Sequence, residues 1–296
     1  MKHLQIGDVT IDRLVELEGT GYEPTFFFPD ATMAGFEGEM GWLLPHFWDS
    51  AANTFLRSIQ SYVVRTGYHT ILVDSCVGHG KERPSTPAWD RLDSTWLDQL
   101  IVAGVRPEEI DYVLCTHLHA DHIGWNTRLE NGSWVPTFPN AKYVFHKDEF
   151  SYWEEHAKDW VGSGSLDGGF EDSVLPVMRA GQVALVDNDF AIDDQVTLEP
   201  TPGHSPGHVC IDVRSSAGHV VLSGDVVHHP IQIAYPEWNS RFCVDPDQSR
   251  ASRKKFVDRH ADRDTLILPA HFASPAAGRI VANGERCKFQ VIDGVD

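Results

Sequence analysis

A dense group of metal-ligand side chains lies near the middle of the chain. His117, His119, Asp121 and His122 fall within six positions and follow the apolar, strand-like stretch Tyr112–Cys115. Alternate residues of an extended segment point to the same side, so His117 and His119 can address one metal ion. Asp121 and His122 come after a turn and can address a second ion. The pattern favours a dinuclear metal site over a histidine-rich surface loop, because the chain also supplies further ligands downstream.

Those further ligands follow strand-like segments in the same way. His204 lies in the turn-rich segment Thr201–His208, between Pro and Gly signals that fix a loop. Asp225 ends an apolar segment that is predicted to be a buried strand, and His271 ends another. An aspartate beside two cations can bridge them with its two oxygens. The sequence therefore predicts that four strand ends converge on one site.

Such a site predicts hydrolysis without a protein nucleophile. Two divalent ions about 3.5–4 Å apart can share a water molecule, lower its pKa and present hydroxide, while one ion polarises a carbonyl or phosphoryl oxygen. Asp121 can orient this bridging hydroxide and carry its proton to the leaving group. Imidazole and carboxylate ligands accept zinc, which is the expected metal, and also iron, manganese or cobalt.

With these residues in place, the chain resembles the metallo-β-lactamase-fold hydrolase superfamily. The resemblance covers nearly the whole chain, from the strand that ends at Asp74 to His271. It implies an α/β fold of four layers, an αββα sandwich. It also implies a ligand set for two ions. In that set the first ion is held by His117, His119 and His204, the second by Asp121, His122 and His271, and Asp225 bridges them.

Details of the ligand set separate the branches of that superfamily. Lactamases usually carry a cysteine at the place of Asp225, and di-iron relatives carry a glutamate at the place of His119. The chain is most similar to the lactonase branch and to the aryl-ester and organophosphate hydrolase branch. The resemblance therefore implies that the substrate is a lactone or an ester of an apolar small molecule.

One position departs from the lactonase pattern. Lactonases that open acyl-homoserine lactones typically carry a tyrosine three positions after the bridging aspartate, and this chain has His228 there. His228 is therefore a candidate catalytic residue, together with Asp121. The departure weakens the assignment to acyl-homoserine lactones and leaves metal-dependent hydrolysis of esters or lactones intact.

Several other functions remain open on the sequence alone. An organophosphate or aryl-ester hydrolase of the methyl-parathion-hydrolase type would use the same ligands. A glyoxalase II-like thioesterase ranks lower, because Val281–Asp296 is too short for a basic glutathione-binding extension. Metal content and oxygen dependence would distinguish a mononuclear iron dioxygenase from a metal-dependent hydrolase. A metal-stabilised scaffold is disfavoured, because scaffolds tend to lose ligands and this chain has the full set.

Two segments are candidate insertions on the substrate side. Residues 19–55 are rich in aromatic side chains and show little periodicity. Phe28 and Trp48 in this insertion, and Trp238 on the loop after Asp225, are expected to bind substrate. The alternatives are ordinary core filling and contact with another subunit, which would make the protein a homodimer. Residues 152–169 contain several glycines and predict a lid or a plain surface loop.

Composition limits the partners. The chain has 296 residues, with 24 basic against 43 acidic side chains and a net charge of -19. This charge disfavours nucleic acid and anionic membranes, so a small-molecule substrate is the expected partner. No apolar run is long enough to span a bilayer and no apolar leader is visible, so a cytoplasmic location is the default expectation. The five cysteines are expected to be reduced core residues.

The remaining elements alternate along the chain without a linker, so we expect one domain over residues 1–296. Helical spacing of apolar residues predicts a helix that begins near Pro87 and ends near Gly104, and two more helices at Lys147–His156 and Asp247–His260. Short apolar segments predict buried strands. These are Val9–Leu17, Ser61–Thr66, Thr70–Asp74, Tyr112–Cys115, Lys142–His146, Val196–Glu199, Val209–Val213, Val220–Gly224 and Leu266–Leu268.

Overall fold

The computed structural model describes residues 2–160 and 166–292. Two compact units are formed within this part of the chain. Residues 17–58 and 189–292 belong to unit 1, and residues 2–16, 59–160 and 166–188 belong to unit 2. The expectation of one domain over the whole chain stays a prediction.

The first sheet has eight strands in the order β1-β2-β4-β5-β6-β9-β10, and β3 pairs with β4. Strands β5, β6, β9 and β10 run parallel to one another, whereas β1, β2 and β3 enter through antiparallel pairs. The strands are β1 His3–Ile6, β2 Val9–Thr20, β3 Trp48–Asp49, β4 Thr54–Arg65, β5 Thr70–Val73, β6 Tyr112–Leu114, β9 Lys142–His146 and β10 Val183–Val186. A separate hairpin pairs β7 Thr127–Glu130 with β8 Ser133–Pro136.

The second sheet has six strands in the order β11-β12-β13-β14-β15-β16. Only β13 and β14 pair in parallel, and the other pairs are antiparallel. Every residue of β14 is buried, as a central strand covered on both faces requires. The strands are β11 Val196–Pro200, β12 Val209–Ser215, β13 Gly218–Leu222, β14 Thr265–Leu268, β15 Gly278–Asn283 and β16 Arg286–Val291.

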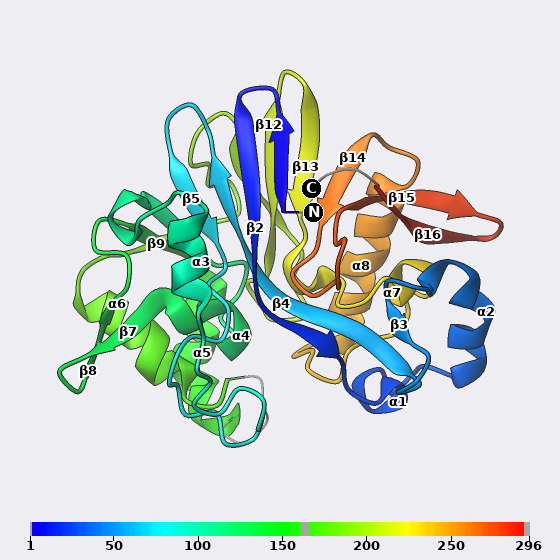
Figure 1. Ribbon diagram of the computed structural model, residues 1–296, viewed down its shortest axis with the longest axis horizontal. Coiled ribbons are helices and arrows are strands. Elements are labelled where there is room, and N and C mark those ends of the chain that lie inside the picture. Colours follow the sequence, from blue (N-terminus) through cyan, green and yellow to red (C-terminus); the bar gives the residue numbers. More distant parts are fainter. Residues whose placement is uncertain (1, 161–165, 293–296) are drawn as a thin grey trace. The chain divides into compact units, whose positions relative to one another are not determined.

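Helices are mostly short. The α-helices are α1 Pro24–Phe27, α2 Met33–Leu43, α3 Trp96–Val102, α4 Ala120–Ile123, α5 Lys147–His156, α6 Leu175–Arg179, α7 Ile231–Ala234 and α8 Pro246–His260. Other helical turns are η1 Pro107–Glu109, η2 Gly124–Asn126, η3 Ala157–Trp160, η4 Phe170–Val174 and η5 Gly224–Val226. Within unit 1, α2 lies beside α7 (Figure 1). Among the described helices, none is long and apolar enough to cross a membrane.

The mixed α/β class with two sheets is confirmed, and each strand predicted from the sequence overlaps a strand of the structure. The helix expected from Pro87 was wrong at its start, because residues 87–91 form turns, residues 92–95 have no regular structure, and the helix begins at Trp96. Arg91 has a φ of 52°, a left-handed conformation that a continuous helix cannot contain. The five cysteines are free, and all but the half-buried Cys287 are buried.

The aromatic insertion, residues 19–55, contains two helices that its weak periodicity did not predict. Side chains cap both helix starts: Glu23 accepts from the amides of Thr25 and Phe26, and Thr32 accepts from that of Gly35. Apart from the exposed Phe26, the aromatic side chains of the insertion join the core of unit 1 or pack against it. Capping and burial therefore stabilise these two helices, although the sequence lacks a helical spacing of apolar residues there.

Candidate metal centre

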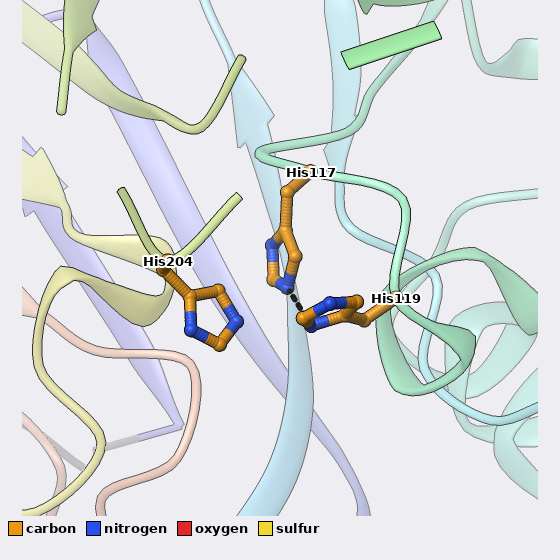
Figure 2. Close-up of side chains that lie close together, drawn as sticks. All are labelled: His117, His119 and His204. Atoms are coloured by element: carbon orange, nitrogen blue, oxygen red, sulfur yellow. Dashed lines mark hydrogen bonds between the residues drawn. The ribbon is translucent and has the colours of Figure 1, made fainter. Parts of the chain in front are cut away.

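In unit 2 the ligand-rich run begins directly after β6. The hydroxyl of Thr116 lies 2.9 Å from Oδ2 of Asp74, and an ionised carboxylate can only accept, so this hydroxyl donates. The lone pair of the same oxygen then accepts from Nδ1 of His117 at 3.1 Å. Nε2 of His117 is thereby left without a proton. It lies 3.0 Å from Nδ1 of His119, the contact drawn as a dashed line in Figure 2.

Asp74 also orients His122. Nδ1 of His122 donates to Oδ2 of Asp74 at 2.8 Å, so Nε2 of His122 carries the lone pair that a metal needs. Asp74 follows β5 with a φ of 56°, and it accepts from the amide of Thr116 as well. Sequence reasoning did not assign this residue a role. The sequence feature that could have pointed to Asp74 is its position at the end of β5, the strand that pairs with β6.

Asp121 and His122 lie on the single turn of α4, with Nε2 of His122 3.8 Å from Oδ1 of Asp121. The next residue but one, Gly124, fixes how this turn packs. A Cβ at Gly124 would lie 1.8 Å from the carbonyl oxygen of Val77, so only glycine allows the two segments to meet. The amide of Gly124 donates to the carbonyl of Cys76 at 2.7 Å. The glycine therefore seats the ligand turn on the loop that follows β5.

A buried glutamate on α5 supports the same run from the other side. Glu149 accepts from the backbone amide of Leu118 at 2.9 Å and from Nε1 of Trp153 at 2.6 Å. The ring of Trp153 packs edge-on against His119, with centroids 5.3 Å apart. Trp153 is fully buried, so this part of the predicted lid is fixed in unit 2. Residues 161–165 of the predicted lid lie outside the described residues.

In unit 1, Asp225 lies in the helical turn η5, directly after β13. Three imidazoles face its two oxygens. Nε2 of His204 and of His228 lie 3.3 and 3.2 Å from Oδ2, and Nε2 of His271 lies 3.1 Å from Oδ1. All four side chains are buried. The two oxygens of one carboxylate thus face different histidines, as a bridging ligand requires.

Nearby groups decide where the protons of these imidazoles lie. Nδ1 of His271 is 2.9 Å from the carbonyl oxygen of Ser58 and donates to it. In neutral His271, Nε2 then presents a lone pair to the carboxylate oxygen of Asp225. Two facing lone pairs repel each other unless a cation lies between them. The donor set therefore fits a metal ion, or else requires a buried imidazolium.

The loop that carries His204 is fixed in a similar way. His208 accepts from the amide of Asp225 at 2.8 Å, and its other ring nitrogen bonds the hydroxyl of Thr201. The Sγ of Cys243 lies 3.7 Å from Nδ1 of His204. From the sequence, a hydrogen bond to a ligand is conceivable for His208, and Cys243 has no role beyond that of a reduced core residue. Both orient a predicted ligand or its backbone.

The described residues contain four groups of three side chains that could hold a metal ion. These groups are His117, His119 and His204; His117, His122 and Asp225; Asp121, His122 and His271; and His204, Asp225 and His228. Figure 2 draws the first group. Every ligand predicted from the sequence belongs to at least one group, and the clusters are consistent with a dinuclear site. His228 joins the fourth group, although the sequence suggested a contact with substrate.

His228 is buried and its ring lies against aromatic neighbours. It stacks on His271 with centroids 6.0 Å apart and meets Phe27 edge-on. Burial lowers the pKa of the imidazole, and Asp225 only partly offsets this effect. Burial therefore favours the neutral form of His228. Its backbone amide donates to Gln232, which holds the start of the loop after Asp225.

The three side chains expected to bind substrate are core residues of unit 1. Phe28, Trp48 and Trp238 are all less than 6% exposed. Phe36 contacts Trp48 and Trp238, with ring centroids 5.2 and 5.5 Å apart. The core-filling alternative therefore describes their packing in the described residues. A role in binding substrate stays a prediction.

A family model for the metallo-beta-lactamase superfamily matches residues 54–271, which is more than half of the chain. This chain belongs to the metallo-beta-lactamase superfamily. The match includes all seven predicted metal ligands of this superfamily member, from His117 to His271.

Relatives with an assigned activity are N-acyl homoserine lactonases. The chain is 31% identical over 190 residues to N-acyl homoserine lactonase AttM of Rhizobium radiobacter, a match that covers 62% of this chain and 66% of that protein. It is 27% identical over 122 residues to an N-acyl homoserine lactonase of Bacillus cereus, covering 40% of this chain and 39% of that protein. The match with AttM thus spans just under two thirds of that relative.

Solved structures share the fold of this superfamily member over its whole length. Hydrolase AbOPH superposes with a TM-score of 0.81 at 23% identity, covering 99% of this chain and 98% of that one. AidC, described as a dizinc quorum-quenching lactonase in complex with a product, also gives a TM-score of 0.81, at 20% identity, covering 100% and 98%. At these identities the likeness establishes the fold, and the predicted fold class is confirmed.

Proposed function

We propose that this chain is a metal-dependent hydrolase of the lactonase type that opens a lactone, or cleaves an ester, of an apolar small molecule. The observation that carries the proposal is the pair of facing acceptors at His271 and Asp225, which a metal ion between them would satisfy. The activity of the relatives supports the lactone as the substrate class, since AttM is an N-acyl homoserine lactonase.

The proposed ligand set divides seven side chains between two ions. His117, His119 and His204 would hold one ion, Asp121, His122 and His271 would hold the other, and Asp225 would bridge them. When bound there, two such cations would supply a water molecule of lowered pKa and a positive charge for the substrate carbonyl. Zinc is the proposed metal, because imidazole and carboxylate donors suit it and AidC is a dizinc protein.

The residues of the chain have separate tasks in this proposal. Asp74 and the carbonyl of Ser58 hold the Nδ1 protons of His122 and His271, so that Nε2 of each ring points its lone pair outward. Asp121 orients the attacking oxygen and carries its proton to the leaving group. No serine or cysteine nucleophile is needed, and the buried thiols have pKa values above the ordinary range because burial disfavours their ionisation.

His228 is proposed to contact the substrate carbonyl, at the position where acyl-homoserine lactonases have a tyrosine. In the described residues its Nε2 faces Asp225 at 3.2 Å. Cations bound to the carboxylate oxygens of Asp225 would weaken the attraction between this carboxylate and the Nε2 proton of His228. That proton would then be available to an oxyanion that develops on the substrate.

The test is a substrate panel run with protein reconstituted with zinc, manganese, iron or cobalt. The panel contains lactones that differ in acyl chain length, aryl esters, thioesters and phosphotriesters. We expect about two metal equivalents per chain and turnover of lactones or simple esters above the other classes. Faster turnover of phosphotriesters would favour the organophosphate hydrolase alternative, and oxygen-dependent activity with one iron per chain would favour the dioxygenase.

Asp225→Asn is the critical variant, with His3→Gln as the matched control. The asparagine keeps the size of the side chain but loses the charge and one acceptor oxygen, so it cannot bridge two cations. We expect loss of at least one metal equivalent and of about 10³-fold or more in kcat. His3 is exposed and its loss should change neither quantity. Full metal content and activity in Asp225→Asn would refute the bridged site.

A further inference from the structure

Helix α8 places one arginine in the interior of unit 1. The side chain of Arg253 is fully buried. Its guanidinium donates to three backbone carbonyls, those of Val226, Pro236 and Trp238, at 2.8–3.0 Å. The remaining hydrogen bonds go to side-chain oxygens of Asn239 and Ser249. Each of these acceptors is neutral.

The backbone acceptors all belong to the loop that follows Asp225. Residues 226–239, which we name the post-aspartate loop, contain His228 and Trp238. Gln232 closes the loop from within, since it accepts from the amide of His228 at 2.6 Å and donates to the carbonyl of Trp238 at 2.8 Å. Arg253 lies outside the loop and donates hydrogen bonds to both of its ends, to Val226 at one end and to Pro236 and Trp238 at the other.

A second path leads from Arg253 to a predicted metal ligand. Nη2 of Arg253 donates to the hydroxyl of Ser249 at 2.9 Å, and this hydroxyl lies 3.3 Å from Sγ of Cys243. Sγ of Cys243 in turn lies 3.7 Å from Nδ1 of His204. The same guanidinium is therefore linked both to the post-aspartate loop, which carries His228, and to Nδ1 of His204.

The chemistry of arginine explains why this position suits no other residue. A planar guanidinium presents five N–H groups in a fixed fork and can tie several acceptors at once, whereas a lysine ammonium has three donors on a flexible stem. Burial lowers the pKa of Arg253 to about 10, so the group is still charged at neutral pH. Burying a cation among neutral acceptors is costly, and an apolar side chain would fill the space without this cost. The cost indicates a positioning role rather than simple core packing.

We propose that Arg253 is a positioning residue that fixes the post-aspartate loop and thereby determines which substrates the site prefers. The preference follows from His228, which the loop carries and which is proposed to contact the substrate carbonyl, so this part of the proposal rests on the proposed function. The positioning of the loop does not rest on the proposed function. The two parts can therefore be tested with separate measurements.

Arg253→Lys tests the positioning, with Arg259→Lys on the same helix as the matched control. Arg259 is exposed and pairs with Glu199. Hydrogen exchange followed by mass spectrometry should show the amides of residues 226–239 exchanging about tenfold faster in Arg253→Lys and unchanged in Arg259→Lys. Asn239→Ala removes the side-chain oxygen that accepts from Arg253 and should also speed amide exchange in residues 226–239, by a smaller factor. This second variant keeps the test decisive if Arg253→Lys does not fold.

Kinetics with lactones of increasing acyl length test the preference. We expect Arg253→Lys to raise KM about tenfold for long acyl chains, to change it little for short ones and to leave kcat within about threefold. Metal content should stay at the wild-type value. In Arg253→Ala, added guanidinium chloride should restore part of the lost preference, and an equal concentration of sodium chloride should not.

Different outcomes separate the two proposals. Unchanged exchange in residues 226–239 of both variants would overturn the positioning role. Equal losses for all substrates, with faster exchange throughout unit 1, would show that Arg253 only packs the core. If the wild-type protein opened no lactone while the loop of Arg253→Lys exchanged faster, the proposed function would fail and the positioning role would stand.

Discussion

At the scale of single residues, proton positions determine what each histidine can do. Asp74, Ser58 and Thr116 fix the Nδ1 protons of three predicted ligands, and each ring then offers Nε2. His228 has no such acceptor on Nδ1 among the described residues. No acceptor on Nδ1 therefore fixes the tautomer of His228, and its role toward the substrate stays a prediction.

Replacing His228 by alanine tests that role. Loss of one donor to a developing oxyanion should lower kcat about 10²-fold and leave the metal content unchanged. His228→Tyr should restore part of the turnover and favour acyl-homoserine lactones, because tyrosine also donates a hydrogen bond. Wild-type kcat in His228→Ala, measured with two metals bound, would show that the cation alone handles the carbonyl.

Glu16 is a second residue whose protonation matters, here for stability. Its carboxylate accepts from the amides of Val77 and Gly78, from Ser94 and from Trp125. Desolvation nevertheless raises its pKa from 4.5 to about 7. Between these two values the folded protein binds the proton more tightly than the unfolded chain.

The sign of the pH effect follows from that difference. The free energy of unfolding should fall as pH rises from 4.5 to about 7, with a slope that approaches about 1.4 kcal/mol per pH unit for this one group. Glu16→Gln does not titrate and should lack this slope. Urea unfolding of both proteins across the interval measures it, and parallel pH profiles would contradict the raised pKa.

At the scale of elements, ligands come from loops and turns at the ends of short buried strands. Strands β5, β6, β13 and β14 are each followed within a few residues by a ligand or by a side chain that orients one. Loops can take the backbone conformations that such sites need, while the paired strands hold their ends in place. The aromatic insertion is different, because its residues are held by packing in the core of unit 1.

Phe28→Ala separates packing from substrate binding in this insertion. Removing a fully buried phenylalanine should lower the free energy of unfolding by about 3–5 kcal/mol. If Phe28 also binds substrate, KM should rise more for long acyl chains than for short ones. Phe26→Ala is the control, because Phe26 lies in α1, two residues before Phe28, but is 47% exposed. An equal change in KM for all substrates would assign Phe28 to the core alone.

At the scale of the whole molecule, the predicted ligands belong to both compact units. His117, His119, Asp121 and His122 lie in unit 2, and His204, Asp225 and His271 lie in unit 1. An ion that binds the folded chain, and binds the unfolded chain weakly, stabilises the protein by mass action.

Chelation should therefore lower the melting temperature. At a free metal concentration 100 times the Kd, each site contributes about 2.7 kcal/mol, which corresponds to a shift of several degrees. Calorimetry of the protein with zinc, after chelation, and after zinc is added back measures the effect. In Asp225→Asn the response to zinc should be smaller. An unchanged melting temperature after complete metal removal would contradict a metal ion that stabilises the folded chain.

The sequence by itself determined the donor residues, because ligand types at close spacing after apolar strands are visible without a structure. It also determined the α/β class through the apolar strand segments. It could not show that Asp74 and Glu149 support the ligands, since each lies about 30 to 50 positions from its partner and one acidic residue among 43 carries no signal.

Tertiary structure alone decided the other features. Helices α1 and α2 depend on caps and on burial of aromatic side chains, and residues 87–95 form turns and irregular backbone although their apolar spacing favours a helix. In both cases long-range packing outweighs a weak local preference. The role of Arg253 was hidden for the same reason: an arginine within a polar, basic helix looks solvent-exposed in the sequence, and only the folded chain places five neutral acceptors around it.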